Sequence, residues 1–204
     1  MARMKIFNTS EQNAYELPPP FNSIERKKYF TIPLAFKELL SELRTPTNQV
    51  CFLVAAGYFK ARQRFFSRKF HQKDIEFVAK QIGIDKEKVK LQFYDRSTYR
   101  RHQGLILGYF GFSPFDALAR EYIEGEIQEM VKVQFRPKII LLEIIQKLRR
   151  RKVTLPTYNL LADMIISAMN THQLELNKTI KSTMTEGIVK LTFDEYKAAL
   201  NWTN

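Results

Sequence analysis

Apolar residues recur at helical spacing along most of the chain, and strand-like alternation of apolar and polar residues is almost absent. The stretch that follows Pro33 is a clear example, because one helical face there carries Leu34, Phe36, Leu39, Leu40 and Leu43. Residues 48–60 are more uniformly apolar, which is typical of a central helix covered on most sides by its neighbours. The pattern therefore predicts an all-α fold.

The helix signals group into small domains arranged in tandem. Pro18 to Pro20 cannot continue a helix, and they mark an arm or linker near the N-terminus. We assign residues 1–112 to a first helical domain and residues 113–185 to a second one. Residues 186–204 are expected to form a tail with one short helix.

A helix-turn-helix element is predicted around Gly83. In this interpretation residues 75–82 form the first helix, Gly83 supplies the positive φ of the turn, and Asp85 caps a second helix that begins at Lys86. The groove-facing side of that second helix would carry Lys86, Glu87, Lys90 and Tyr94. Any two packed helices joined by a glycine can imitate the pattern, and these charged side chains would then form an ordinary solvated face.

A further helix is predicted over residues 97–110, ended by Gly111. Arg96, Arg100 and Arg101 form a basic cluster at its N-terminal end, where free backbone amides also favour phosphate. His102 follows the cluster, and no Ser, Cys or Asp is placed by motif to act with it in catalysis. We interpret it as a packed or phosphate-binding histidine.

The second half of the chain contains another basic cluster. A helix is predicted to begin at Pro137 and to end in a run of cations: Lys147, Arg149, Arg150, Arg151 and Lys152. Complementing the helix dipole accounts for one or two such cations but not for a run of this density. Leu155 and Pro156 then precede a long helix whose first turn presents Thr157, Tyr158 and Asn159. We interpret this as a second, looser helix-turn-helix, with the basic turn on the DNA backbone and the polar residues near base edges.

The charge balance indicates which partner these clusters suit. The 204 residues include 33 Lys and Arg against 21 Asp and Glu, a formal net charge of +12 that favours nucleic acid. No apolar run is long enough for a membrane span, and no signal peptide is recognisable. The single Cys51 lies within an apolar run and predicts a buried thiol in a reducing compartment. No Cys or His cluster could hold zinc, so we expect neither metal nor cofactor.

Four segments in this order carry a family resemblance: TNQVCFLVAAGYFK, VAKQIGI, YDRSTYRRHQGLILGYFGFSPF and IIQKLRRRKVTLPTYNLLADMI. Together they resemble the N-terminal region of transposases of the Tn-three family, the replicative transposons that move through cointegrates. The family has a tyrosine, spaced arginines and a histidine before a helix ending in Gly-Phe, matched here by Tyr94, Arg96, Arg100, His102, Gly111 and Phe112. It also ends a helix in Leu-Arg and opens the next with Leu-Pro, matched by Leu148, Arg149, Leu155 and Pro156. The resemblance covers roughly residues 4–182.

The resemblance implies tandem helical domains that bind double-stranded DNA at the terminal inverted repeats of a transposon. In that family an RNase-H-like catalytic domain with three metal-binding carboxylates lies far downstream. Two-metal phosphoryl chemistry needs carboxylates on a rigid scaffold of strands, and no credible set of central strands is predicted here. We therefore expect this chain to bind DNA without enzymatic activity. The expected location is the bacterial cytoplasm, at the nucleoid when bound to DNA.

Two other classes of function stay open. A stand-alone regulator of the same fold would occupy transposon ends or a promoter without transposing anything. A helical protein-interaction module would use the same amphipathic helices, and its basic clusters would be incidental. Self-association of the chain is a further expectation.

Overall fold

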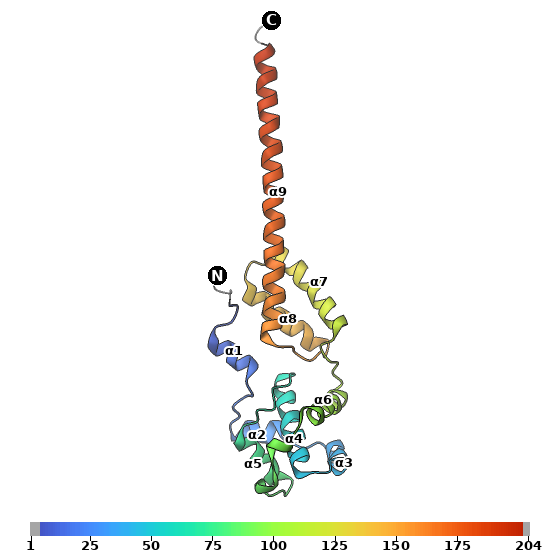
Figure 1. The fold of residues 1–204 in the computed structure, drawn as a ribbon. Coiled ribbons are helices and arrows are strands. Elements are labelled where there is room, and N and C mark those ends of the chain that lie inside the picture. Colours follow the sequence, from blue (N-terminus) through green and yellow to red (C-terminus); the bar gives the residue numbers. More distant parts are fainter. Residues whose placement is uncertain (1–4, 202–204) are drawn as a thin grey trace.

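The computed structural model describes the backbone of residues 5–201 and the side chains of residues 5–185. This part of the chain forms α-helices and short 3-10 turns, and its only β-type pairing is an isolated bridge between Ser113 and Val153. The helices build two packed bodies, and one long helix leads away from them (Figure 1). The prediction of an all-α fold is confirmed.

The first body surrounds α4 (Pro46–Arg62), which is buried from Val50 to Phe59 as expected for a central helix. Its N-terminus is capped by Thr45, whose hydroxyl accepts the amide of Asn48 at 3.1 Å. The helices that complete this body are α2 (Ser23–Tyr29), α3 (Leu34–Glu42), α5 (Gln72–Gln81) and α6 (Arg96–Phe110). Many of the side chains between them are aromatic, and their rings contact one another.

Gly57 allows α2 to approach α4 closely. A β-carbon at this position would lie 2.2 Å from Cδ1 of the Phe30 ring, which follows the end of α2. Such a distance is far below van der Waals contact, and the ring is itself packed against Phe21 and Tyr58. Only glycine fits here without displacing the ring.

A buried carboxylate ties three helices of the first body together. The side chain of Asp74 is fully buried, and its Oδ1 lies 2.6 Å from Nε of Arg26. The hydroxyl of Tyr58 donates to the other oxygen, Oδ2, at 2.7 Å, and accepts the backbone N–H of His71 at 3.1 Å. These bonds satisfy the carboxylate and connect α2, α4 and α5.

The turn after α5 forms where the sequence predicts it. Gly83 adopts a φ of +69°, a conformation that favours glycine. The carboxylate of Asp85 accepts the amide of Glu87 at 3.0 Å, so the predicted cap is also present.

The helix expected to begin at Lys86 does not form, and that prediction is wrong. Two 3-10 turns replace it, η1 (Lys86–Lys88) and η2 (Leu91–Phe93). The hydroxyl of Thr47, a buried residue at the start of α4, accepts the amide of Lys90 at 2.9 Å and removes that amide from any helical ladder. The segment therefore follows α4 rather than presenting a recognition helix.

The second body consists of α7 (Ala117–Val133), α8 (Pro137–Arg150) and the first part of α9 (Tyr158–Asn201). The short helix α1 (Thr9–Glu16), which the sequence pattern groups with the first domain, also packs here, against α9. The side chains of the N-terminal segment that join this second core are Ile6, Phe7 and Tyr15. The N-terminal segment thus packs in the second core, apart from the residues that follow it in sequence.

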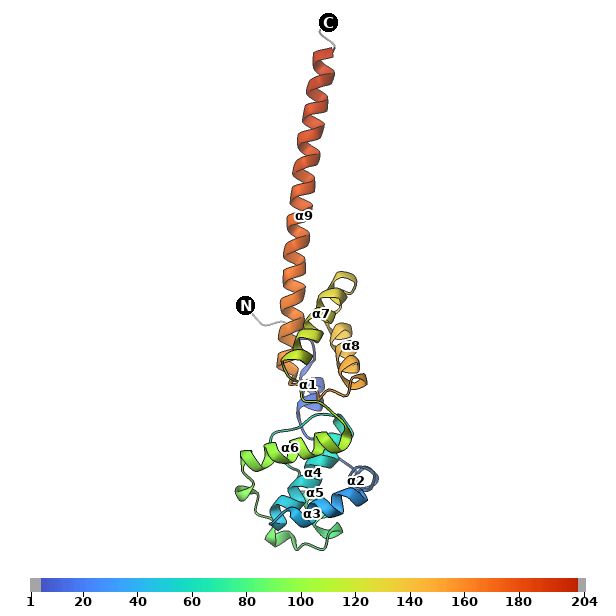
Figure 2. The ribbon, with the colours of Figure 1, turned by 90° about the vertical axis from the view of Figure 1, so that its right-hand side faces the viewer.

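The long helix α9 extends well past the second body (Figure 2). Its backbone is continuous to Asn201, so the short separate helix expected in residues 186–204 is instead the end of α9. The side chains of residues 186–204 lie outside the described residues.

Backbone hydrogen bonds join the two bodies directly. The carbonyl of Gln63, after α4, accepts the amide of Leu155 at 3.0 Å. Ser113 exchanges backbone bonds with the turn after α8, donating to Lys152 at 2.8 Å and accepting from Thr154 at 2.9 Å. The turn after α8 is therefore held against the first body.

Arg64 reinforces this junction with a mostly buried side chain. Its guanidinium donates to the carbonyl of Tyr15 at 2.7 Å and lies 4.4 Å from the centre of the Tyr15 ring. The hydroxyl of Tyr15 donates in turn to the carbonyl of Pro156 at 2.9 Å. The N-terminal segment, the first body and the second body thus meet around this one cation.

Candidate nucleic-acid interface

The clearest basic surface lies at the N-terminal end of α6. Asp95 caps this helix, with Oδ1 accepting the amide of Thr98 at 2.6 Å. Arg96, Arg100 and Arg101 are exposed, and none of them forms an ion pair with a carboxylate among the described side chains. Three cations beside the positive end of a helix dipole make a surface that attracts an anion.

Tyr94 and His102, expected at this surface, lie in the core instead. Both side chains are almost completely buried, and Oη of Tyr94 is 2.7 Å from Nδ1 of His102. Burial, with a smaller contribution from Arg101, lowers the pKa of His102 to about 4. Burial also raises the pKa of the Tyr94 hydroxyl. We correct the assignment accordingly: this neutral pair supports α6 from inside, and the packed alternative for His102 holds.

The loop that follows α4 adds cations that the sequence-based site did not include. The hydroxyl of Tyr99 donates to the carbonyl of Phe66, which holds the loop against α6. Arg68 donates from Nη1 to the carbonyl of Tyr94 at 2.5 Å, and the exposed Lys69 follows it. The signal for this cluster is the dense basic run of residues 60–73, but its position beside α6 depends on tertiary contacts.

The turn after α8 carries the second basic cluster, as predicted. Arg150, Arg151 and Lys152 are exposed, and Lys152 takes a left-handed backbone conformation with φ of +52°. Arg151 stacks over the ring of Tyr122, with Cζ 3.9 Å from the ring centre. Arg149 is partly buried, and its Nε has no hydrogen-bond partner in the described structure.

The first turn of α9 presents only part of the set expected there. Thr157 and Asn159 are exposed, whereas Tyr158 is buried. The hydroxyl of Tyr158 accepts the backbone amides of Ile6 and Phe7, both at 3.0 Å. Tyr158 therefore anchors the N-terminal segment and does not point at a DNA surface.

Lys86 lies on the 3-10 turn η1 and Lys90 directly before η2, so neither lies on an α-helix. Nζ of Lys86 is 3.7 Å from a carboxylate oxygen of Glu76, an exposed and therefore weak ion pair. Lys90 is exposed, close to the start of α4 through the bond of its amide to Thr47. Neither lysine has the geometry of a base-reading residue on a recognition helix.

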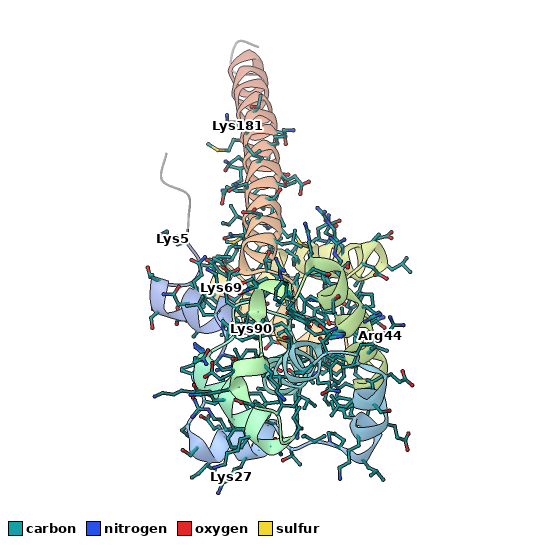
Figure 3. All side chains as sticks on the ribbon, turned by 60° about the horizontal axis from the view of Figure 1, so that its bottom comes forward. Lys5, Lys27, Arg44, Lys69, Lys90 and Lys181 are labelled. Carbon is teal, nitrogen blue, oxygen red and sulfur yellow. The ribbon has the colours of Figure 1, made fainter. Side chains whose placement is uncertain are left out.

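The structure connects the α6 cluster with the α8 turn. The loop after α4 reaches α6 through Phe66 and the second body through Gln63. At the other end of α6, a β-carbon on Gly111 would be 3.8 Å from Nζ of Lys152. Figure 3 shows Lys69 and Lys90 over the middle of the view, and Lys27 and Arg44 towards its edges. Positive charge thus extends over several elements, and its two dense clusters lie on α6 and on the turn after α8, which the contacts above connect.

Side chains that could bind a metal do not cluster in the described part of the chain. The described side chains contain no group of three or more His, Cys, Asp or Glu residues that could hold a metal ion. Cys51 is buried, and burial raises the pKa of its thiol to about 12, which keeps it unreactive. A groove of about 740 Å³ lies between α7 and α9, with charged and small side chains along it. In the part of the chain that the structure describes, no helix is both long and apolar enough to cross a membrane.

A protein-family model matches residues 6–168, and its description is a domain of unknown function, DUF4158. The chain belongs to this family. A comparison with curated proteins finds none that matches.

The DUF4158 match coincides with the packed part of the chain. It begins at Ile6, the first N-terminal residue in the second core, and ends at Ala168 on α9, which packs against the same core. The projecting part of α9 lies beyond the match. The matched residues therefore include both bodies and the N-terminal segment that packs in the second one.

Proposed function

We propose that this chain binds double-stranded DNA in a sequence-specific manner, as the N-terminal DNA-binding region of a Tn-three family transposase that recognises terminal inverted repeats. The observation that carries the proposal is the exposed cluster of Arg96, Arg100 and Arg101 on α6, which forms no ion pair with any described carboxylate. The net charge of +12 and the ordered motifs shared with that family support the same function.

The two basic clusters have different parts in this proposal. The arginines of α6 project from a regular helix, so they reach base edges in a groove, where an Arg side chain pairs with guanine through two hydrogen bonds. Arg150 and Lys152 lie on a turn, where side chains suit phosphate contacts that set the orientation of the protein. The hydrogen bonds between the bodies keep the two clusters in one register on the duplex.

The test compares two triple-alanine variants with the same net charge. One replaces Arg96, Arg100 and Arg101, and the matched control replaces three exposed lysines elsewhere in the first body: Lys27, Lys37 and Lys73. Both lose three positive charges, so long-range attraction to DNA falls by the same amount. Binding to a site selected from a random pool and to random duplex is measured by fluorescence anisotropy.

We expect the α6 variant to lose at least about tenfold in affinity for the selected site, because one base-reading contact is worth about 1–3 kcal/mol. The ratio of its affinity for that site to its affinity for random duplex should also fall. The control should lose less than about threefold and keep the preference. Equal losses in both variants would show that only overall charge matters and would contradict the proposal.

A second candidate function, a helical interaction module, is favoured by one observation on α9. Its projecting part exposes Leu174, Ile180 and Met184. Such a helix gains stability when its apolar residues pack against another helix. Light scattering over a range of protein concentrations tests self-association, with Ile180→Glu as the variant that should abolish it. A mass that stays monomeric at every concentration would remove self-association from the account.

A further inference from the structure

Phe93 is an exposed aromatic residue immediately before α6. The Phe93 residue is 71% exposed. Among the described phenylalanines, Phe135 is the other one that is strongly exposed, at 67%. A phenylalanine left in water forgoes the free energy that its burial would contribute. A single exposed apolar residue is ordinary on its own. The surroundings of Phe93 are what distinguish it.

The backbone holds Phe93 firmly on both sides. Before it, the amide of Lys90 is bonded to Thr47, and the carbonyl of Lys90 accepts the amide of Phe93 at 3.0 Å. After it, Tyr94 is buried, with its hydroxyl against His102 and its carbonyl accepting from Arg68. An apolar ring is therefore displayed from a short turn that is anchored at both ends.

Cations surround the ring along the chain. Lys88, Lys90 and Arg96 are exposed within five residues of Phe93, and none has an ion-pair partner among the described carboxylates. Two acidic residues are close in sequence: Asp95, whose carboxylate caps α6, and Glu87 on η1. The net local charge is positive, which complements a phosphate backbone and opposes burial of the ring in a basic partner.

We propose that Phe93 inserts between adjacent base pairs of the bound duplex, partly unstacking that step and kinking the DNA. This rests on the proposed DNA-binding function and assigns a role that the arginines of α6 cannot perform. Phenylalanine is one of the apolar side chains that DNA-bending proteins insert between base steps as a wedge, and the bend lets more of the protein surface contact the DNA. The position of Phe93 before the N-terminus of α6 places the wedge next to the helix that would lie in the groove.

A mismatch provides a probe that needs no knowledge of the recognised sequence. A mismatched pair is already partly unstacked, so a wedge binds it more easily than a fully paired step. Two duplexes of about 30 base pairs share one arbitrary sequence and differ only in a central mismatch. The affinity for each duplex is measured for the parent protein, Phe93→Ala and the control Phe135→Ala. End-to-end energy transfer between dyes on the duplex measures the kink in each complex.

The parent and Phe135→Ala should bind the mismatched duplex at least about fivefold more tightly than the paired one, with a shorter end-to-end distance. Phe93→Ala should bind both duplexes equally, without shortening, while its far-ultraviolet circular dichroism matches that of the parent. If Phe93→Ala keeps the mismatch preference and the kink, the wedge is refuted even though DNA binding stands. If the parent binds no duplex at all, the proposed function itself fails.

Discussion

Replacing Tyr158 by phenylalanine tests whether the Tyr158 hydroxyl holds the N-terminal segment in place or reads DNA bases. The change removes the hydroxyl that accepts the amides of Ile6 and Phe7 and keeps the ring, which stacks on Phe7 with centroids 5.3 Å apart. Each buried amide left without a partner costs about 1–3 kcal/mol. The N-terminal segment can detach and hydrate its amides, which limits the total. We therefore expect a loss of about 2–3 kcal/mol.

Urea unfolding followed by circular dichroism measures this loss, and limited proteolysis reports whether the N-terminal segment detaches first. Tyr109→Phe is the matched control, because Tyr109 is 43% exposed and its hydroxyl accepts no backbone amide in the described part of the chain. Tyr158→Phe should unfold at lower urea and be cleaved earlier near the N-terminus, and Tyr109→Phe should resemble the parent. A Tyr158→Phe protein with parental stability but no discrimination between DNA sequences would show that the hydroxyl reads bases.

Three further changes test the first body. Asp74→Ala should lower the free energy of unfolding by about 3 kcal/mol in a urea titration, since it strands the mostly buried Arg26; unchanged stability would mean that this pair contributes little. Gly57→Ala should lower the thermal midpoint, at a cost of about 1–3 kcal/mol, because its β-carbon overlaps Phe30; a parental midpoint would mean that the ring moves freely. Folding lowers the pKa of His102 from 6.5 to about 4, so the unfolded chain binds a proton at this residue at higher pH than the folded chain does. The free energy of unfolding should therefore fall as pH decreases from 6.5 to about 4, by up to about 1.4 kcal/mol per pH unit. The stability difference between the parent and His102→Gln should therefore depend on pH across that window, and a constant difference would contradict the assigned state of His102.

Local signals in the sequence predict much of this fold. The uniformly apolar residues 48–60 become the buried centre of α4, and the two glycines with positive φ, Gly83 and Gly111, end their helices where expected. The basic turn after α8 also lies at the predicted position. These features depend on residues close together in sequence, whose conformational preferences act locally.

The predictions that were wrong concern residues whose hydrogen-bond partners lie far away along the chain. The hydroxyl of Thr47 takes the amide of Lys90 and prevents the helix expected at Lys86. The hydroxyl of Tyr158 accepts amides about 150 residues before it in the sequence, so this residue anchors the N-terminal segment and does not read bases. A charged segment with no apolar face of its own, such as residues 86–90, is the kind of segment whose structure its tertiary neighbours decide.

The central claim, sequence-specific DNA binding by two linked bodies, is tested most directly by selecting bound duplexes from a random pool. Because the arginines of α6 are the proposed base-reading residues, repeated rounds should enrich one shared motif. The variant without Arg96, Arg100 and Arg101 should enrich this motif weakly or not at all. A final pool without any shared motif, from a protein that binds every duplex equally, would contradict the account.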